Sequence, residues 1–160
     1  EKFDNAVFVE IGVWKGKSAV YLAEKIKESG KNIKFYAIDP FDGSGEEWEY
    51  MQDIDFINKT LFQTYQKNIE PIKQYINTIV GLSSEVHTQF QCNDFLFIDG
   101  DHSYEGLMND LKLWWPKIKK GGVIAGHDYN QPTCGVKKAV DEFFGNKVSV
   151  FEWWQWIVNK

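Results

Sequence analysis

The sequence has few of the features that mark secreted, membrane-spanning or nucleic-acid-binding proteins. Its 2 cysteines, Cys92 and Cys134, are far apart and do not form a paired metal-binding spacing, so we expect reduced thiols. No apolar run approaches the length of a membrane span, and no signal peptide precedes the first predicted strand. The formal net charge is −5 and no lysine-rich run stands out, which argues against binding to a nucleic-acid backbone. We therefore expect a cytoplasmic protein without a membrane or nucleic-acid partner.

The length of the chain favours a single domain. A chain of 160 residues corresponds to one domain, residues 1–160, and is long enough to bury a core. Aromatic residues make up 16% of the chain, and most of them are expected in that core. The chain begins at Glu1 rather than at methionine, so the sequence leaves open whether a segment precedes it. It also leaves open whether the protein forms a homo-oligomer.

The first motif is an apolar run that ends in an acid, followed by a glycine turn and a helix. It covers Val7–Ser18, and its short β-branched and aromatic run predicts a strand buried on both faces. Ser18 is expected to cap the helix, in which apolar residues recur at helical spacing. These residues are Ala19, Leu22, Ala23 and Ile26. In open α/β folds, a strand, turn and helix of this kind bind nucleotides at the carboxyl edge of the sheet.

Three cofactor chemistries use such a turn, and residue spacing separates them. A dinucleotide fingerprint needs a glycine where this chain has Trp14. A P-loop needs four residues between its glycines, whereas three separate Gly12 from Gly16. A P-loop-like nucleotide hydrolase stays an alternative, because Phe95–Asp99 has the pattern of the acidic strand that serves its magnesium ion. S-adenosylmethionine carries no phosphate and needs only a glycine turn with an acid nearby, which Glu10 supplies.

Two further strands extend the predicted nucleotide-binding half. The run Ile33–Asp39 predicts a second strand whose terminal acid would accept hydrogen bonds from ribose hydroxyls. Thr78–Val80 predicts a third strand, after which Ser83 either contacts an adenine or caps a helix. Between these strands, residues 41–53 predict a surface loop that either contacts substrate or is solvated, and residues 56–69 predict one helix.

Ionisable side chains follow two later strands. The fourth predicted strand, Phe95–Asp99, is followed by Asp101 and His102. The fifth, Val123–Ala125, is followed by the pair His127–Asp128. Because parallel strands end at the same edge of a sheet, we expect these groups to lie close together. Charges concentrated in this way are costly without a ligand or a metal ion.

The remaining segments after the fourth predicted strand have the patterns of helices and a hairpin. Ser103 is expected to cap a helix, and Lys119–Gly122 is expected to form the turn before the fifth strand. Another helix is expected to begin at Gln131. The tail, residues 148–158, predicts two strands joined by a short turn.

These motifs resemble class I S-adenosylmethionine-dependent methyltransferases, and specifically the metal-dependent O-methyltransferases related to macrolide-sugar (macrocin-type) and aminocoumarin-sugar enzymes. The resemblance rests on the first motif, on Ile98–Glu105, on Asp110 and on Lys120–Tyr129, and it covers nearly the whole chain. The chain is more distantly similar to catechol O-methyltransferase. The resemblance implies an α/β fold, a Rossmann-like three-layer sandwich with a mostly parallel seven-stranded sheet and an antiparallel C-terminal hairpin.

The same resemblance implies two sets of ligand-binding residues. Those for S-adenosylmethionine are Glu10, Gly12, Gly16, Ser18, Asp39, Ser83 and Asp99. A divalent metal ion would bind to Asp99, His127 and Asp128, although many relatives have an aspartate in place of His127. An all-oxygen set suits magnesium, whereas an imidazole ligand shifts the preference toward manganese or iron. His127 either binds the ion or orients Asp128.

The implied reaction is methyl transfer to a hydroxyl of a small molecule or sugar. The metal ion would bind the acceptor hydroxyl and lower its pKa, and His102 would remove the proton, with Asp101 as the alternative base. In a purely structural interpretation, His102 caps a helix or supports the site. Two further alternatives are a non-catalytic cofactor-binding module and an oxygenase with Asp99, His102 and His127 as its iron ligands.

Overall fold

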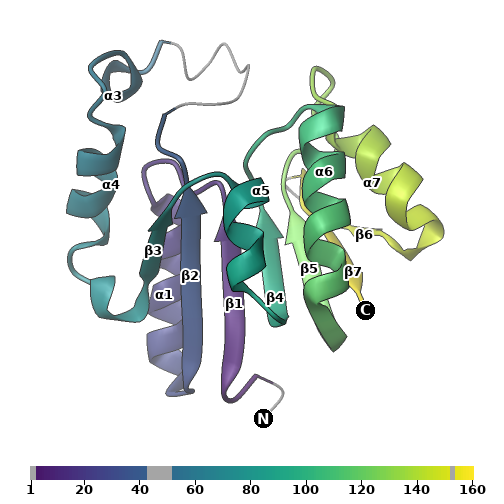
Figure 1. Ribbon diagram of the computed structural model, residues 1–160, viewed down its shortest axis with the longest axis horizontal. Helices are drawn as coiled ribbons and strands as arrows, with labels where there is room; N and C mark the ends of the chain where they lie inside the picture. The colour runs from purple at the N-terminus through teal and green to yellow at the C-terminus, as the bar shows by residue number, and fades with distance from the viewer. Residues whose placement is uncertain (1–2, 43–51, 152–153) are drawn as a thin grey trace.

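The described part of the chain contains one sheet of seven strands in the order β3-β2-β1-β4-β5-β7-β6 (Figure 1). The computed structural model describes residues 3–42, 52–151 and 154–160. In chain order, the strands are β1 Ala6–Ile11, β2 Ile33–Asp39, β3 Asn77–Val80, β4 Asn93–Ile98, β5 Ile118–Gly126, β6 Ser149–Val150 and β7 Trp156–Asn159. The first five strands are parallel to one another, and β7 is antiparallel to both β5 and β6. The predicted mostly parallel sheet with an antiparallel C-terminal hairpin is confirmed.

Helices cover both faces of this sheet. They are α1 Lys17–Ser29, α3 Ile54–Ile57, α4 Leu61–Ile69, α5 Ser83–Val86, α6 Tyr104–Trp114 and α7 Val136–Phe144. Helices α1 and α4 contribute to one hydrophobic cluster, and α5, α6 and α7 contribute to the other. Two helical layers around a central sheet confirm the predicted three-layer sandwich.

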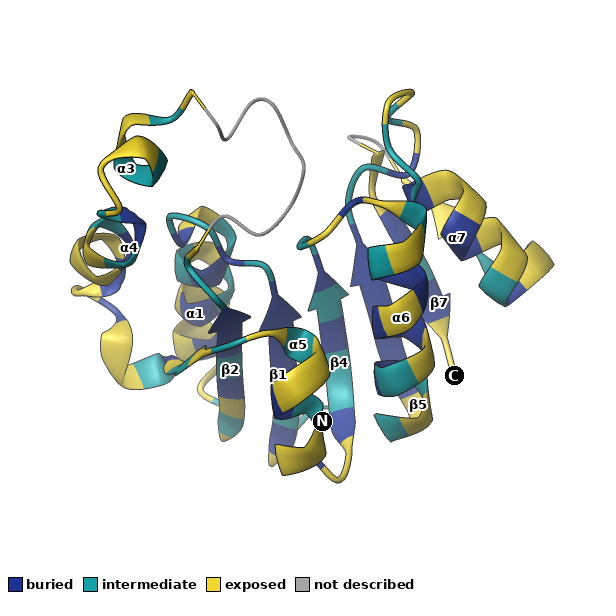
Figure 2. Cartoon of the chain, turned by 45° about the horizontal axis from the view of Figure 1, so that its top comes forward, coloured by how far each residue is buried: buried dark blue, intermediate teal, exposed yellow. Residues whose placement is uncertain are grey.

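Strand β1 explains why both layers are needed. Val9 and Ile11 belong to the cluster with α5, α6 and α7, whereas Ala6 and Phe8 belong to the cluster with α1 and α4. Successive side chains of a strand point to opposite faces, so an almost continuously apolar strand must be covered twice. Figure 2 shows the result, with buried residues along the central strands and exposed residues on the outer sides of the helices.

Three local predictions are wrong. The helix expected over 56–69 is divided into α3 and α4, because Lys59 adopts a left-handed φ of 56° between them. The glycines expected in a turn lie inside β5, where the Gly121 N–H donates to the Lys160 carbonyl oxygen at 2.7 Å. Helix α7 begins at Val136, five residues after the expected start at Gln131.

Three further expectations concern a surface loop, membrane-spanning helices and the cysteines. Most of the loop predicted over 41–53 lies outside the described residues, which exclude 43–51. Within the described ranges, no helix combines the length and the apolar composition needed to cross a bilayer. The two cysteines are both free thiols.

Candidate functional site

The two motifs predicted from the sequence meet at the carboxyl edge of the sheet. The Asp99 N–H donates to the Ile11 carbonyl oxygen at 2.8 Å, which joins the ends of β1 and β4. Gly12 has a φ of +79°, and a Cβ on it would lie 2.3 Å from the Asp99 carbonyl oxygen. A side chain at this position would therefore be strained and would also collide with the backbone that follows β4. Glycine is required here because the turn after β1 packs directly against the residues that follow β4.

Asp39 stabilises the turn itself. Its Oδ2 accepts hydrogen bonds from the Val13 and Trp14 N–H groups at 2.8 and 2.9 Å, and its Oδ1 accepts one from the Phe41 N–H at 2.7 Å. Trp14 has a φ of 48°, an uncommon conformation for a bulky residue. Burial raises the pKa of Asp39, and the three N–H donors act in the opposite direction. Since Oδ1 accepts only one of these bonds, it retains capacity for a ribose hydroxyl.

Glu10 is a buried acid beneath the turn. It is 1% exposed, and neither carboxylate oxygen has a hydrogen-bond partner of normal geometry among the described residues. Burial raises the pKa of Glu10 to about 8, while the nearby Ser18 hydroxyl lowers it and the charges of Asp99 and Asp39 raise it further. An unpaired buried carboxyl is costly. The positively charged cofactor S-adenosylmethionine fits this environment.

Ser18 and Ser83 do not have the capping roles considered for them. Helix α1 begins at Lys17, its N-cap is Gly16, and no side chain caps it, so the prediction that Ser18 caps this helix is wrong.

Ser83 is the first residue of α5, which also lacks a side-chain cap. The Ser83 hydroxyl donates to Asp110 Oδ1 at 2.5 Å. Burial raises the pKa of Asp110 to about 6, and the Ser83 bond lowers it. The adenine contact of Ser83 stays a prediction.

Two acids and one histidine come together beside this turn. His102 Nε2 lies 3.3 Å from Asp99 Oδ1 and 3.3 Å from Asp128 Oδ2. One ligand atom from each residue lies within 4.8 Å of the other two. His102 is 7% exposed, so its ring position is well defined by packing. A single N–H hydrogen cannot point at two carboxylates at once, and both distances exceed the usual N–H···O range. A cation between the three groups would satisfy all of them.

The other predicted residues lie around this trio. His127 Nδ1 lies 3.1 Å from Asp128 Oδ1, and the side chain of His127 is 34% exposed. Asp128 has a φ of 58°, a strained conformation of the kind that occurs at functional sites. Asp101 lies three residues before α6, and its Oδ1 accepts a hydrogen bond from the Ser103 N–H at 2.8 Å. Ser103 caps this helix as predicted, because its hydroxyl accepts from the Gly106 N–H at 3.0 Å.

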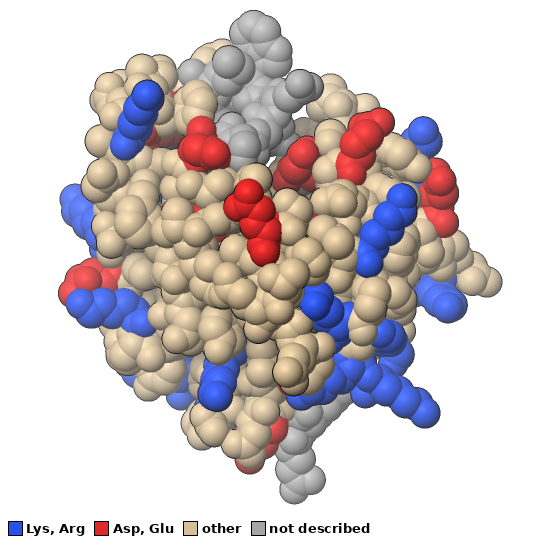
Figure 3. All heavy atoms as spheres, viewed as in Figure 1, with Lys and Arg blue, Asp and Glu red and all other residues tan. Residues whose placement is uncertain are grey.

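His102 was predicted to be a base, and its place between the two carboxylates was not predicted. The signal for a ligand role was the spacing of Asp99 and His102, which are three residues apart, together with an acid at the end of the next strand. The wider surroundings suit a cation. On the face shown in Figure 3, acidic side chains gather toward the top, where the parallel strands end, and most lysines lie lower.

Fold and site together define an α/β enzyme with a cofactor turn over a buried acid, and with an Asp-His-Asp group at the same sheet edge. Residues 9–129 match the family described as a methyltransferase domain, and the chain belongs to this family. The protein is an S-adenosylmethionine-dependent methyltransferase, as the resemblance of its motifs implied. The interpretations as a P-loop hydrolase and as a non-catalytic module do not agree with this result.

One curated protein of known sequence is similar to most of this chain. An uncharacterised protein of Acanthamoeba polyphaga mimivirus is 30% identical over 155 residues, which cover 93% of this chain and 66% of that protein. The chain thus spans about two thirds of the length of this curated relative.

Two solved structures of O-methyltransferases share the fold. The O-methyltransferase NovP superposes with a TM-score of 0.66 at 16% identity, covering 97% of this chain and 72% of NovP. The calicheamicin methyltransferase CalS11 superposes with a TM-score of 0.69 at 14% identity, covering 96% of this chain and 72% of CalS11. The resemblance to the O-methyltransferase group is thereby confirmed at the level of fold.

Proposed function

We propose that this enzyme methylates a hydroxyl group of a small molecule or sugar, and that a divalent metal ion assists the reaction. The observation that carries the proposal is the position of His102 Nε2, 3.3 Å from a carboxylate oxygen of both Asp99 and Asp128. Oxygen as the acceptor is supported by the likeness to NovP, an O-methyltransferase, and to CalS11, a TDP-rhamnose 3'-O-methyltransferase. The acidic sheet edge also favours a small substrate over a nucleic acid.

The cofactor in this proposal lies across the glycine turn and the end of β2. Glu10 would face its positive charge, Gly12 and Gly16 would form the turn beside it, and Asp39 would accept from the ribose. The remaining assigned contacts are Ser18, Ser83 and Asp99. Glu10 supports this placement most directly, because its buried carboxylate oxygens lack a hydrogen-bond partner of normal geometry among the described residues.

The metal site in this proposal consists of Asp99, His102 and Asp128. Two carboxylates and one imidazole favour manganese or another transition ion over magnesium. When bound, the ion supplies a positive charge that orients the acceptor hydroxyl and lowers its pKa. His127 would orient Asp128 through their 3.1 Å contact, which is the second of the two roles predicted for it. Methyl transfer is an in-line displacement, so these residues act mainly by positioning the acceptor.

A second candidate is a metal-free methyltransferase in which His102 is the general base. The observation that favours it is the same pair of carboxylates, because both would stabilise the charge that the imidazole gains with the proton. A histidine that binds a metal ion through Nε2 cannot accept a proton at that atom, so the two candidates exclude each other.

Calorimetric titration with S-adenosylhomocysteine and with Mn²⁺ tests the proposal. We expect the wild type to bind both, His102→Ala to lose at least tenfold in Mn²⁺ affinity while it keeps its affinity for S-adenosylhomocysteine, and His127→Ala to lose less. His87→Ala, at a half-buried histidine outside the trio, is the matched control. Absence of Mn²⁺ binding in the wild type would favour the metal-free candidate, and absence of S-adenosylhomocysteine binding would contradict the proposed cofactor site.

A further inference from the structure

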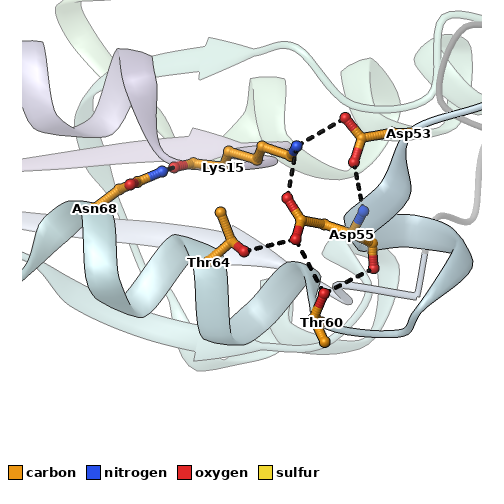
Figure 4. Close-up of polar contacts among 6 residues, drawn as sticks. All are labelled: Lys15, Asp53, Asp55, Thr60, Thr64 and Asn68. Carbon is orange, nitrogen blue, oxygen red and sulfur yellow. Dashed lines mark hydrogen bonds and ion pairs between the residues drawn. The ribbon is translucent and has the colours of Figure 1, made fainter.

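The cofactor turn is connected to the region of α3 and α4 by a lysine. Lys15 Nζ lies 2.7 Å from Asp53 Oδ2 and 2.7 Å from Asp55 Oδ2 (Figure 4). The backbone of Lys15 is fixed as well, because the Asn68 side-chain amide donates to its carbonyl oxygen at 2.9 Å. Both the side chain and the backbone of one turn residue therefore contact this distant segment of the chain.

The two acids that hold Lys15 also organise the segment they belong to. Asp53 is the N-cap of α3, where its Oδ1 accepts from the Asp55 N–H at 2.9 Å. Asp55 Oδ1 accepts from the hydroxyls of Thr60 and Thr64 at 3.0 and 2.9 Å. Hydrogen bonds from Lys15 lower the pKa of both acids, and those acids raise the pKa of Lys15. All three groups are charged at neutral pH, and neither acid can move without breaking a second contact.

The turn needs such support because its conformation is unfavourable. Trp14, the residue before Lys15, is left-handed with a φ of 48°, and a bulky residue adopts this conformation only when its surroundings impose it. Asp39 stabilises one side of the turn through the Val13 and Trp14 N–H groups. The contacts of Lys15 with the α3 and α4 segment stabilise the other side.

We propose that Lys15 is a positioning residue for S-adenosylmethionine, because its ion pairs with Asp53 and Asp55 keep the glycine turn in the conformation that binds the cofactor. This inference rests on the proposed location of the cofactor at the turn. Lys15 itself does not contact the cofactor in this proposal, since two carboxylates already neutralise its ammonium group. The side chains of Lys15, Asp53 and Asp55 are 28%, 26% and 21% exposed, so water screens the pairs only in part.

The test is the dissociation constant of S-adenosylhomocysteine, measured by calorimetry at low and high salt. Lys15→Met removes the charge and keeps most of the side-chain length, and we expect it to raise the Kd about three- to tenfold. Lys15→Arg restores a charged donor and should recover most of the affinity. Lys17→Met is the matched control, because Lys17 is exposed two residues away and makes no ion pair with a described residue; its Kd should equal that of the wild type.

A double-mutant cycle separates positioning from direct contact. If Lys15 acts through the two acids, Lys15→Met should have little further effect in a protein that carries Asp53→Asn and Asp55→Asn. An undiminished effect in that background would overturn the proposal in favour of direct contact. Equal Kd values for the wild type and Lys15→Met would overturn the role of Lys15 alone, whereas no binding to the wild type would overturn the cofactor site as well.

Discussion

Glu10 illustrates how one residue can serve function at the expense of stability. It lies in the middle of a buried parallel sheet, where an apolar side chain would be expected, and burial raises its pKa to about 8. The folded protein near neutral pH therefore keeps this carboxyl largely protonated. A positively charged cofactor beside Glu10 would favour the ionised form and would stabilise the folded protein on binding.

Glu10→Gln should change the pH dependence of stability. The ordinary pKa of a glutamate side chain, 4.5, applies to Glu10 in the unfolded chain, and burial raises its pKa in the folded protein to about 8. Between these values the unfolded chain has lost the proton that the folded chain retains, so the free energy of unfolding of the wild type falls as the pH rises. The variant lacks this contribution and should become more stable relative to the wild type by up to about 1.4 kcal/mol per pH unit. Urea unfolding across this pH range measures the difference.

Glu24→Gln is the control for this prediction, because Glu24 is exposed on the surface of α1. The wild type and this control should have parallel stability curves. A difference between Glu10→Gln and the wild type that did not vary with pH would contradict the assignment of a raised pKa to Glu10.

At the scale of elements, two loops at the carboxyl edge interlock to position His102. The Gly135 N–H donates to the His102 carbonyl oxygen at 2.8 Å, which joins the segment after β5 to the segment after β4. A Cβ on Gly135 would lie 2.1 Å from the Tyr104 backbone nitrogen. The absence of a side chain at Gly135 therefore lets the two segments approach, and this approach places Asp128 and His102 at one site.

Gly135→Ala should disturb the site more than the fold. The added methyl group must displace the backbone at Tyr104, two residues after His102, and overpacking of this kind costs about 1–3 kcal/mol. We expect at least a tenfold loss in Mn²⁺ affinity by calorimetry. Gly30→Ala is the control: its Cβ meets no atom within 4 Å, so it should lose only about 1 kcal/mol from its left-handed backbone and keep the metal affinity. Equal Mn²⁺ affinities for both variants would contradict the proposed interlock.

At the scale of the whole molecule, two hydrophobic clusters depend on the same strands. One contains residues of α5, α6 and α7, the other contains residues of α1 and α4, and β1 contributes alternate residues to both. Loss of either cluster would expose one face of an apolar sheet. The described parts of the chain should therefore unfold in one cooperative transition.

Leu111→Ala should test this coupling. Leu111 lies on α6 and is 0% exposed, so its truncation should cost about 2–5 kcal/mol. The urea midpoint should shift by the same amount for far-UV circular dichroism and for tryptophan fluorescence. Leu82→Ala, at a side chain that is 40% exposed, should change stability by less than about 1 kcal/mol. Separate transitions for the two probes would show that the clusters unfold independently.

The fold class and most of the residues at the sheet edge could be predicted from local patterns in the sequence. Apolar strands that must be covered twice, the glycine turn after Glu10 and the polar ends of two later strands are local patterns with direct physical causes. Two of the elements predicted wrongly were decided by long-range pairing, in β5, or by one unusual φ angle, at Lys59. Residues 119–122 resemble a turn, but their pairing with the C-terminal strand extends β5 through them.

The combination of polar groups at the site depends on how distant segments pack in the folded protein. The sequence grouped Asp99 with His127 and Asp128, whereas the fold places His102 between the two carboxylates and His127 beside one of them. It also brings Lys15 of the turn to two aspartates almost forty residues later, Asp53 and Asp55. Spacing along the chain cannot give these distances, because each depends on how separate loops pack after the sheet has formed.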